Sequence, residues 1–173
     1  MYLESPRLIL RQPETGDVDA YLAIRNAEFV LRYNAMACEN RDKTLAQFSK
    51  AASDGNMLLL ELKETRQIIG AVFMEEDSLR YDVASKELSY FLAEAYSRQG
   101  YMKEALHTLI SHLFAAEDLE CVAARSFAPN IASRRLLESL GFQLNGIIPR
   151  CVKGYGDVIF DDTLYSLFRK DFQ

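Results

Sequence analysis

One stretch of this chain, residues 87 to 105, constrains the fold more than any other. Its first six residues, ELSYFL, have the composition and the length of a β-strand. From Tyr101 onward, apolar residues recur every three or four positions, which is typical of an amphipathic helix. The pattern changes from strand to helix at Gly100, so the chain is predicted to turn tightly there.

The predicted start of this helix is a candidate anion site. The first backbone N–H groups of a helix have no partner inside it, and they lie at the positive end of the helix dipole. Gly100 has no Cβ that would hold a ligand away, and Arg98 and Lys103 add positive charge nearby. Such a site suits a phosphate group. An ordinary strand-to-helix connection explains the same pattern, so both interpretations stay open on this stretch alone.

Length and composition predict one domain over residues 1–173. The chain has 173 residues, of which 49% are hydrophobic, enough for a substantial core. Its net charge of -5 argues against nucleic acid as the main partner, because that binding depends on Lys and Arg. No apolar run reaches the roughly 20 residues of a membrane span, and the first residues do not resemble a secretion signal. We therefore expect a cytoplasmic protein with no membrane partner.

The cysteines and histidines do not predict a disulfide framework or a metal site. Cys38, Cys121 and Cys151 are odd in number and far apart, and Cys121 is expected to behave as a buried hydrophobic residue. His107 and His112 are five residues apart, which does not place them on one helical face as a metal pair. The acidic residues near the C-terminus lack the spacing of a calcium loop; they are Asp157, Asp161 and Asp162.

Periodicity and turn residues predict an α+β fold, with about seven strands in one mixed, mostly antiparallel sheet and four helices packed on it. The strands are expected at 7–13, 57–63, 67–75, 87–92, 121–128, 143–150 and 158–168, and the helices at 15–26, 42–55, 101–114 and 130–142. Gly70 inside the third strand suggests a bulge.

The segment from residue 29 to residue 40 has no regular pattern. It contains the apolar residues Phe29, Leu31, Tyr33 and Met36. These residues could form a wall of a substrate site, or they could pack under a loop as part of the core. Packing is the commoner role of isolated aromatic residues.

Three phrases of the sequence, in this order, resemble the GNAT superfamily of acyl-CoA N-acyltransferases. Within it they are most similar to the branch of ribosomal-protein N-terminal acetyltransferases. The phrases are ESPRLILRQP at 4–13, ELSYFLAEAYSRQGYMKEAL at 87–106 and NIASRRLLESLGFQLNGIIP at 130–149. The resemblance covers nearly the whole chain, and it implies the GNAT-like mixed sheet, acetyl-CoA as acyl donor and no metal.

The resemblance also implies how the coenzyme is held. In the family, backbone N–H groups of the loop before the long helix bind the pyrophosphate, which here places the contacts at Arg98, Gln99, Gly100, Tyr101 and Met102. The side chains of Arg98 and Lys103 could also meet phosphates of the coenzyme, although an exposed, solvated charge is the commoner case for each. Ser97 and Met102 depart from the usual residues of this loop, and the bulk of Met102 could crowd the helix start.

The pantetheine arm of the coenzyme is expected beside the preceding strand and the next helix. The backbone of Tyr90, Phe91 and Leu92 would meet the arm like an added strand, and Asn130 would bond to it. Asn130 is also a suitable N-cap, and the two roles are compatible. Arg135 could meet a phosphate, although a solvated charge is the commoner case.

For the chemistry, the resemblance points to Glu87 and Ser133. Glu87 is the candidate base, acting directly or through a water that it holds, and burial near Leu88 and Phe91 would raise its pKa. The family's usual tyrosine is replaced by Leu137, so Ser133 becomes the candidate hydrogen-bond donor to the leaving sulfur. Alternatively, Glu87 simply meets solvent or an arginine, and Ser133 satisfies helix backbone groups.

The sequence therefore predicts an N-acetyltransferase that moves an acetyl group from acetyl-CoA to a primary amine by direct attack. A protein N-terminus is the first choice of acceptor, and a small-molecule amine is the alternative. Glu28, Glu39 and Asp42 could attract a cationic acceptor. The alternative from another functional class is a regulatory protein that binds acyl-CoA without catalysis. We expect a monomer or a homodimer.

Overall fold

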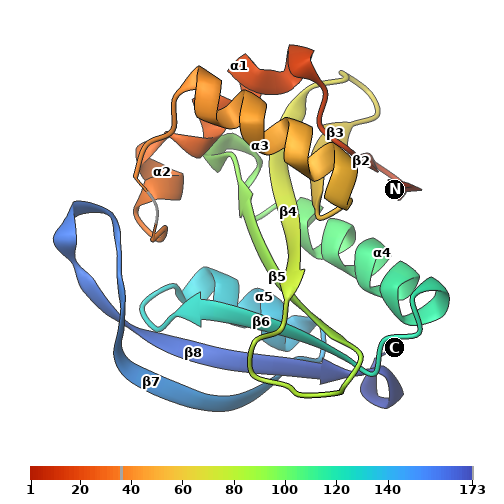
Figure 1. The fold of residues 1–173 in the computed structure, drawn as a ribbon, viewed down its shortest axis with the longest axis vertical. Helices are drawn as coiled ribbons and strands as arrows, with labels where there is room; N and C mark the ends of the chain where they lie inside the picture. Colours follow the sequence, from red (N-terminus) through yellow and green to blue (C-terminus); the bar gives the residue numbers. More distant parts are fainter. Residues whose placement is uncertain (36, 173) are drawn as a thin grey trace.

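The computed structural model describes residues 1–35 and 37–172, so Met36 of the candidate wall lies outside the described residues. One sheet of eight strands runs through the molecule in the order β1-β2-β3-β4-β5-β6-β8-β7 (Figure 1). The strands are β1 (Tyr2–Glu4), β2 (Leu8–Arg11), β3 (Met57–Leu62), β4 (Ile68–Glu76), β5 (Ser85–Leu92), β6 (Cys121–Phe127), β7 (Gln143–Lys153) and β8 (Ile159–Phe168). Neighbouring strands are antiparallel except for β5 and β6.

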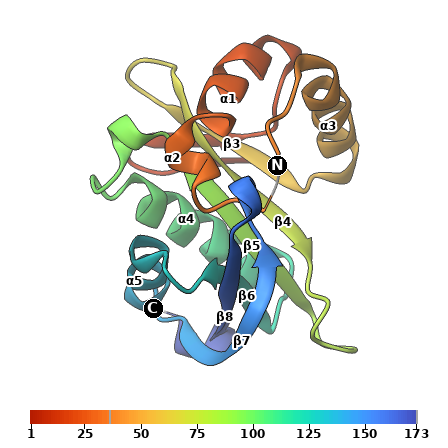
Figure 2. The same ribbon diagram turned by 90° about the vertical axis from the view of Figure 1, so that its left-hand side faces the viewer.

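Helices cover both faces of the sheet. The described α-helices are α1 (Val18–Arg25), α2 (Glu28–Leu31), α3 (Arg41–Asp54), α4 (Tyr101–Ala116) and α5 (Ile131–Ser139). Helices α4 and α5 pack on one face, and α1 and α3 pack on the other (Figure 2). This confirms the predicted mixed α+β fold. None of the helices in the described part is long and apolar enough to cross a membrane.

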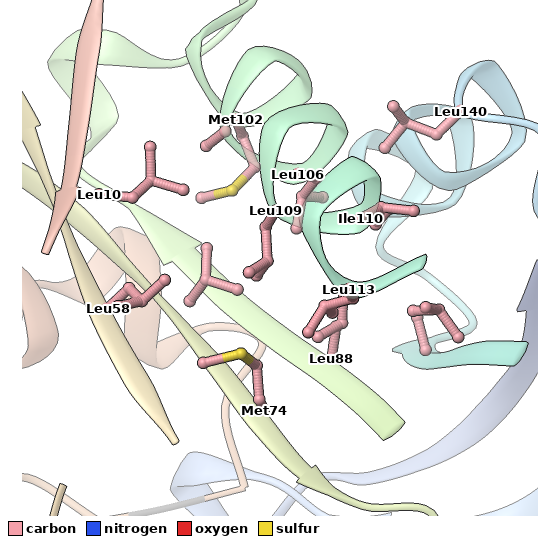
Figure 3. Close-up of a cluster of buried hydrophobic side chains, with 14 of the residues drawn as sticks. Leu10, Leu58, Met74, Leu88, Met102, Leu106, Leu109, Ile110, Leu113 and Leu140 are labelled. Carbon is pink, nitrogen blue, oxygen red and sulfur yellow. The ribbon is translucent and has the colours of Figure 1, made fainter. Parts of the chain in front are cut away.

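The two faces of the sheet have separate hydrophobic cores, because successive side chains of a strand point to opposite sides. On β3, Leu58 and Leu60 lie in the core under α4, whereas Leu59 lies in the core under α1 and α3. The apolar stripe of α4 fills the first core; its members include Leu106, Leu109, Ile110 and Leu113 (Figure 3). This packing fixes the long helix and therefore also fixes where its first turn lies.

Two elements differ from the sequence prediction. The sheet has one strand more than expected, because β1 is only three residues long and forms by pairing with β2. The segment after residue 28 is not wholly irregular, because residues 28–31 form the short helix α2. Leu31 is buried in this helix and Phe29 is exposed, so Leu31 has the packing role and Phe29 does not.

The predicted bulge lies beside Gly70. The register between β3 and β4 shifts after the pair Leu60 and Gly70, leaving one extra residue on β4. A Cβ on Gly70 would stand 2.4 Å from the backbone oxygen of Phe91. Only glycine therefore allows β5 to approach β4 so closely at this point.

Candidate active site

The two parallel strands in the middle of the sheet separate partway along their length. Strands β5 and β6 pair from Ser85 with Cys121 to Leu88 with Ala124. Beyond that point β5 continues along β4, and β6 continues along β8 (Figure 1). In the described part of the chain, residues 89–92 of β5 thus have no strand on their β6 side. Their free backbone groups could accept an extended ligand arm as an added strand.

The predicted turn lies just beyond the end of β5 and forms as expected. Helix α4 begins at Tyr101, and Gly100 at its N-cap has a φ of 82°. Arg98 also has a positive φ of 60°, so the loop adopts a left-handed conformation at two positions. The side chain of Gln99 stabilises the loop by donating to the backbone oxygen of Ala95 at 2.8 Å. Gly100 has no side chain to accept from the first N–H groups of α4, so the helix start suits an anion.

Met102 does not crowd this helix start, although its bulk made that possible from the sequence. Its side chain is only 6% exposed and points into the core under α4, toward Leu10 (Figure 3). The second residue of α4 faces the sheet, and a large apolar side chain is favourable there. The departure from the usual loop residue therefore adds to the core and leaves the ligand side of the loop open.

Arg7, which the sequence analysis did not single out, lies against the loop. It precedes β2, and its Nη1 atom donates to the backbone oxygen of Gln99 at 3.1 Å. Its guanidinium carbon lies 4.1 Å from the ring centroid of Tyr101, and its Nε atom bonds to Glu104 at 2.7 Å. Arg7 thus ties the loop to the first turn of α4. It is 92 residues from Gln99 in sequence, so only the tertiary structure brings the two together.

The charged residues that the sequence predicted near the coenzyme lie at the surface. Arg98, Lys103 and Arg135 are all exposed.

His107 packs against the ring of Phe172, with 5.0 Å between the ring centroids. Among residues 1–35 and 37–172, no group of three His, Cys, Asp or Glu side chains is placed to hold a metal ion.

Glu87 lies one residue before Leu88, the last residue of β5 that pairs with β6. Its side chain is on the face of the sheet opposite α4. It is half-buried, and burial raises its pKa above the ordinary value for a carboxyl. The positive charge of Arg125 opposes this rise, whereas the negative charges of Asp77, Glu75 and Asp162 add to it. Glu75 stands directly across from Glu87 on β4. A raised pKa brings this carboxyl closer to the range in which a side chain can act as a base.

Arg125 and Asp162 form an ion pair on the same face as Glu87. Their Nε and Oδ2 atoms are 2.7 Å apart, and Asp162 is only 2% exposed. Burial raises the pKa of Asp162, and Arg125 opposes that shift. The sequence analysis considered Asp162 only as a metal ligand and did not consider Arg125. Alternation along β6 and β8 places both side chains on this face, but the pairing of these distant strands was needed to show it.

Ser133 and Asn130 lie at the start of α5, on the other side of the gap. The Asn130 side chain accepts from the backbone N–H of Ser133 at 3.2 Å, which confirms the predicted N-cap. Because this cap uses the amide oxygen, the amide nitrogen of Asn130 is the donor that a ligand could use. The hydroxyl of Ser133 lies 2.8 Å from the hydroxyl of Tyr90, which extends from β5. Sequence analysis had assigned Tyr90 a backbone role alone.

A pocket of about 450 Å³ lies between α2 and the hairpin of β7 and β8. Its walls are mostly apolar, and they are formed by Glu28, Leu31, Arg32, Tyr33, Pro129, Tyr155, Val158 and Phe160. The backbone N–H of Tyr155 at the hairpin end donates to the backbone oxygen of Asn34 at 2.9 Å. Of the apolar residues in segment 29–40, Tyr33 and the buried Leu31 both line this cavity. The Glu39 carboxylate instead lies 3.7 Å from the guanidinium of the buried Arg25, so Glu39 forms an ion pair with an interior charge.

Comparison with known proteins agrees with this geometry. The chain is 28% identical to the uncharacterized N-acetyltransferase YoaA of Bacillus subtilis over 96% of both chains. The structure superposes with a TM-score of 0.83 on a ribosomal-protein-S5-alanine acetyltransferase from Vibrio fischeri, at 20% identity, covering 100% of this chain and 99% of that one. RimJ of Mycobacterium smegmatis, solved in complex with CoA-disulfide, gives a TM-score of 0.82 at 20% identity, covering 98% and 87% of the two chains.

The family model described as an acetyltransferase (GNAT) domain matches residues 7–143. That span includes the loop before α4, the gap between β5 and β6, and the start of α5. At 20% identity the two solved structures support the common fold and nothing narrower. The sequence match and the shared fold agree, and the chain belongs to the GNAT acetyltransferase family.

Proposed function

We propose that this protein transfers an acetyl group from acetyl-CoA to a primary amine, which attacks the thioester directly. The observation that carries the proposal is the separation of β5 from β6 just after Glu87, with the glycine-led start of α4 beyond the end of β5. We assign the phosphate site to the start of α4 and the base to Glu87, whose carboxyl has a raised pKa, with the separation of the two strands between them.

The residues of the opening fit acetyl-CoA. A Cβ at Gly100 would have only the Nη2 atom of Arg7 within 4 Å, at 3.4 Å, so the ligand side of this loop is open. The coenzyme contributes an acetyl group on a good leaving group. We assign its phosphates to the backbone of residues 98–103 and its arm to Asn130 and to the backbone of residues 90–92.

Glu87 then serves as the base, directly or through a water. An amine must lose a proton to become a nucleophile, and an N-terminal amine has a pKa of about 7.7 to 8.0. A carboxylate with a raised pKa is basic enough to take that proton near neutral pH. Ser133, across the gap, is assigned as a hydrogen-bond donor to the sulfur.

A protein N-terminus is our first choice of acceptor. The pocket of about 450 Å³ beside α2 is wide and mostly apolar, which suits the first side chains of a peptide. The negative charges of Glu75 and Glu87 favour the approach of a cationic amine. The fold is shared with the ribosomal-protein-S5-alanine acetyltransferase, whose name states a protein substrate.

The test combines calorimetric titration of acetyl-CoA with a thiol-release assay over a panel of acceptors. The panel holds short peptides with free N-termini, the same peptides with blocked N-termini, polyamines and free amino acids. We expect free thiol only with peptides whose N-terminus is free. Release with small amines alone would overturn the choice of acceptor, and binding without release for any member would indicate an acyl-CoA-binding regulatory protein.

Arg7 supports the coenzyme loop in this proposal. Replacement of Arg7 by Ala removes the bond to the Gln99 backbone oxygen and the packing on Tyr101, so the loop is less well ordered before binding. We expect acetyl-CoA to bind about fivefold to tenfold more weakly, corresponding to the net contribution of roughly one ordinary hydrogen bond. Titration calorimetry measures the change.

Lys63→Ala is the matched control for Arg7→Ala. The Lys63 side chain also forms an ion pair near the N-terminus, with Glu4 at 2.6 Å, and the backbone N–H of Lys63, which alanine keeps, donates to the backbone oxygen of Arg7. Its loss should leave the Kd for acetyl-CoA within about twofold, since surface ion pairs contribute little. Equal affinities in wild-type protein and Arg7→Ala would show that the loop does not depend on Arg7.

A further inference from the structure

Two hydroxyl groups face each other across the gap between β5 and β6. Tyr90 lies on β5 two residues beyond the last position paired with β6, and Ser133 lies in the first turn of the helix that follows β6. Their oxygens are 2.8 Å apart. In the described part of the structure, this bond joins β5 to α5 at the level where the strands have already separated.

The chemistry of the two groups sets the direction of the bond. A phenol is a stronger acid than an aliphatic alcohol, so the phenol is the better donor and the serine oxygen the better acceptor. Burial raises the pKa of Tyr90 to about 12, so Tyr90 keeps its proton at neutral pH. With Tyr90 donating to Ser133, the hydroxyl hydrogen of Ser133 is free to point elsewhere, and the incoming bond polarises it.

From this juxtaposition we propose that Tyr90 is a positioning residue for the leaving group: its hydroxyl orients that of Ser133 toward the departing sulfur and strengthens it as a donor. The proposal rests on the proposed function above, which places the sulfur near Ser133. Many family members carry a tyrosine on the helix, at the position that is Leu137 here, and Leu137 is buried in the core. In this chain the phenol comes from strand β5 instead.

The step balances without an additional acid. A bond forms between the amine nitrogen and the acetyl carbon, and the carbon–sulfur bond breaks with its electron pair remaining on sulfur. The amine proton goes to Glu87 or its water, and the thiolate later takes a proton from solvent. A thiol has a pKa of about 8.5, so neither hydroxyl needs to give up its proton. The two groups act by hydrogen bonding to the developing negative charge, and both remain neutral.

A binding measurement tests the proposal independently of turnover. At about pH 9.5 a thiol of pKa about 8.5 is mostly ionised, so CoA carries a thiolate. Desulfo-CoA lacks the sulfur. The ratio of the two affinities therefore reports the hydrogen bond to the thiolate. We expect wild-type protein to bind CoA about tenfold more tightly than desulfo-CoA. Tyr90→Phe should reduce that preference to about threefold, and Ser133→Ala should abolish it.

Kinetics supply the second measurement. Tyr90→Phe should lower kcat about fivefold to tenfold with the KM for acetyl-CoA within about twofold, because the hydroxyl acts through Ser133 on the leaving group alone. The double variant Tyr90→Phe, Ser133→Ala should be no slower than Ser133→Ala, since Tyr90 has no effect once its partner is absent. Additive losses in the double variant would overturn the proposal.

Tyr165→Phe is the matched control, because it also removes a buried phenol hydroxyl that bonds to α5. That hydroxyl accepts from Arg134 at 3.2 Å and donates to Glu138 at 3.1 Å, so its hydrogen-bond partners on α5 in the described structure do not include Ser133. If Tyr165→Phe lowered the preference for CoA as much as Tyr90→Phe, the effect would be one of helix placement and the inference would be wrong. If wild-type protein bound CoA but released no thiol with any amine, the proposed function would fail instead.

Discussion

Replacing Gly100 by Val is expected to weaken acetyl-CoA binding by about tenfold to a hundredfold in a protein that remains folded. Gly100 has a φ of 82°, a conformation that costs a β-branched residue about 1 to 3 kcal/mol. The loop would relax toward negative φ, and its N–H groups would turn away from the phosphates. The valine methyl groups would also occupy the space that the ligand needs.

Titration calorimetry of acetyl-CoA measures this change, and Gly55→Val is its control. Gly55 ends α3 with a φ of 66°, so valine there introduces the same kind of strain far from the loop. Both variants should lose stability to heat by a similar amount. Only Gly100→Val should lose affinity. A folded Gly100→Val protein with wild-type affinity would show that this loop does not hold the coenzyme phosphates.

Replacing Glu87 by Gln is expected to lower kcat about a hundredfold near neutral pH, the usual contribution of a positioned base. Burial raises the pKa of Glu87, and a base works only when ionised, so wild-type kcat should fall as the pH falls through that raised pKa. The variant should lack this dependence. The loss should be largest below the pKa of the amine, about 7.7 to 8.0 for an N-terminus, because above it the free amine needs no base.

The stability of Glu87→Gln should not fall at neutral pH. The folded protein holds a proton on Glu87 more tightly than the unfolded chain does, because burial disfavours the ionised form. Ionisation above the folded pKa therefore reduces the free energy of unfolding, and glutamine removes that reduction. A thermal melt at pH 7 should give a Tm equal to or above that of wild-type protein.

Glu75→Gln separates the role of Glu87 from a general effect of charge on this face. The negative charge of Glu75 contributes to the raised pKa of Glu87. Its removal should therefore move the acidic limb of the pH profile to lower pH, with the maximum kcat little changed. If Glu87→Gln showed the same pH profile as wild-type protein, another group or solvent would be the base.

Most of the fold was predictable from the sequence because it depends on local patterns. Apolar periodicity located α4, and the turn residues Gly55, Gly100 and Gly141 lie at or beside helix ends with positive φ, as expected. The sequence could not show β1, whose three residues are ordered by their pairing with β2. It also could not show α2, which is too short for a periodic signal.

What the sequence alone determined was therefore the order of strands and helices, the glycine-led turn before α4 and the family resemblance, since each depends on residues close together in the chain. The tertiary structure alone decided which distant side chains meet: Arg7 with the loop, Arg125 with Asp162, and Tyr90 with Ser133. The reason is physical: strand pairing and helix packing determine where a side chain lies, and both are set by contacts between segments far apart in the chain.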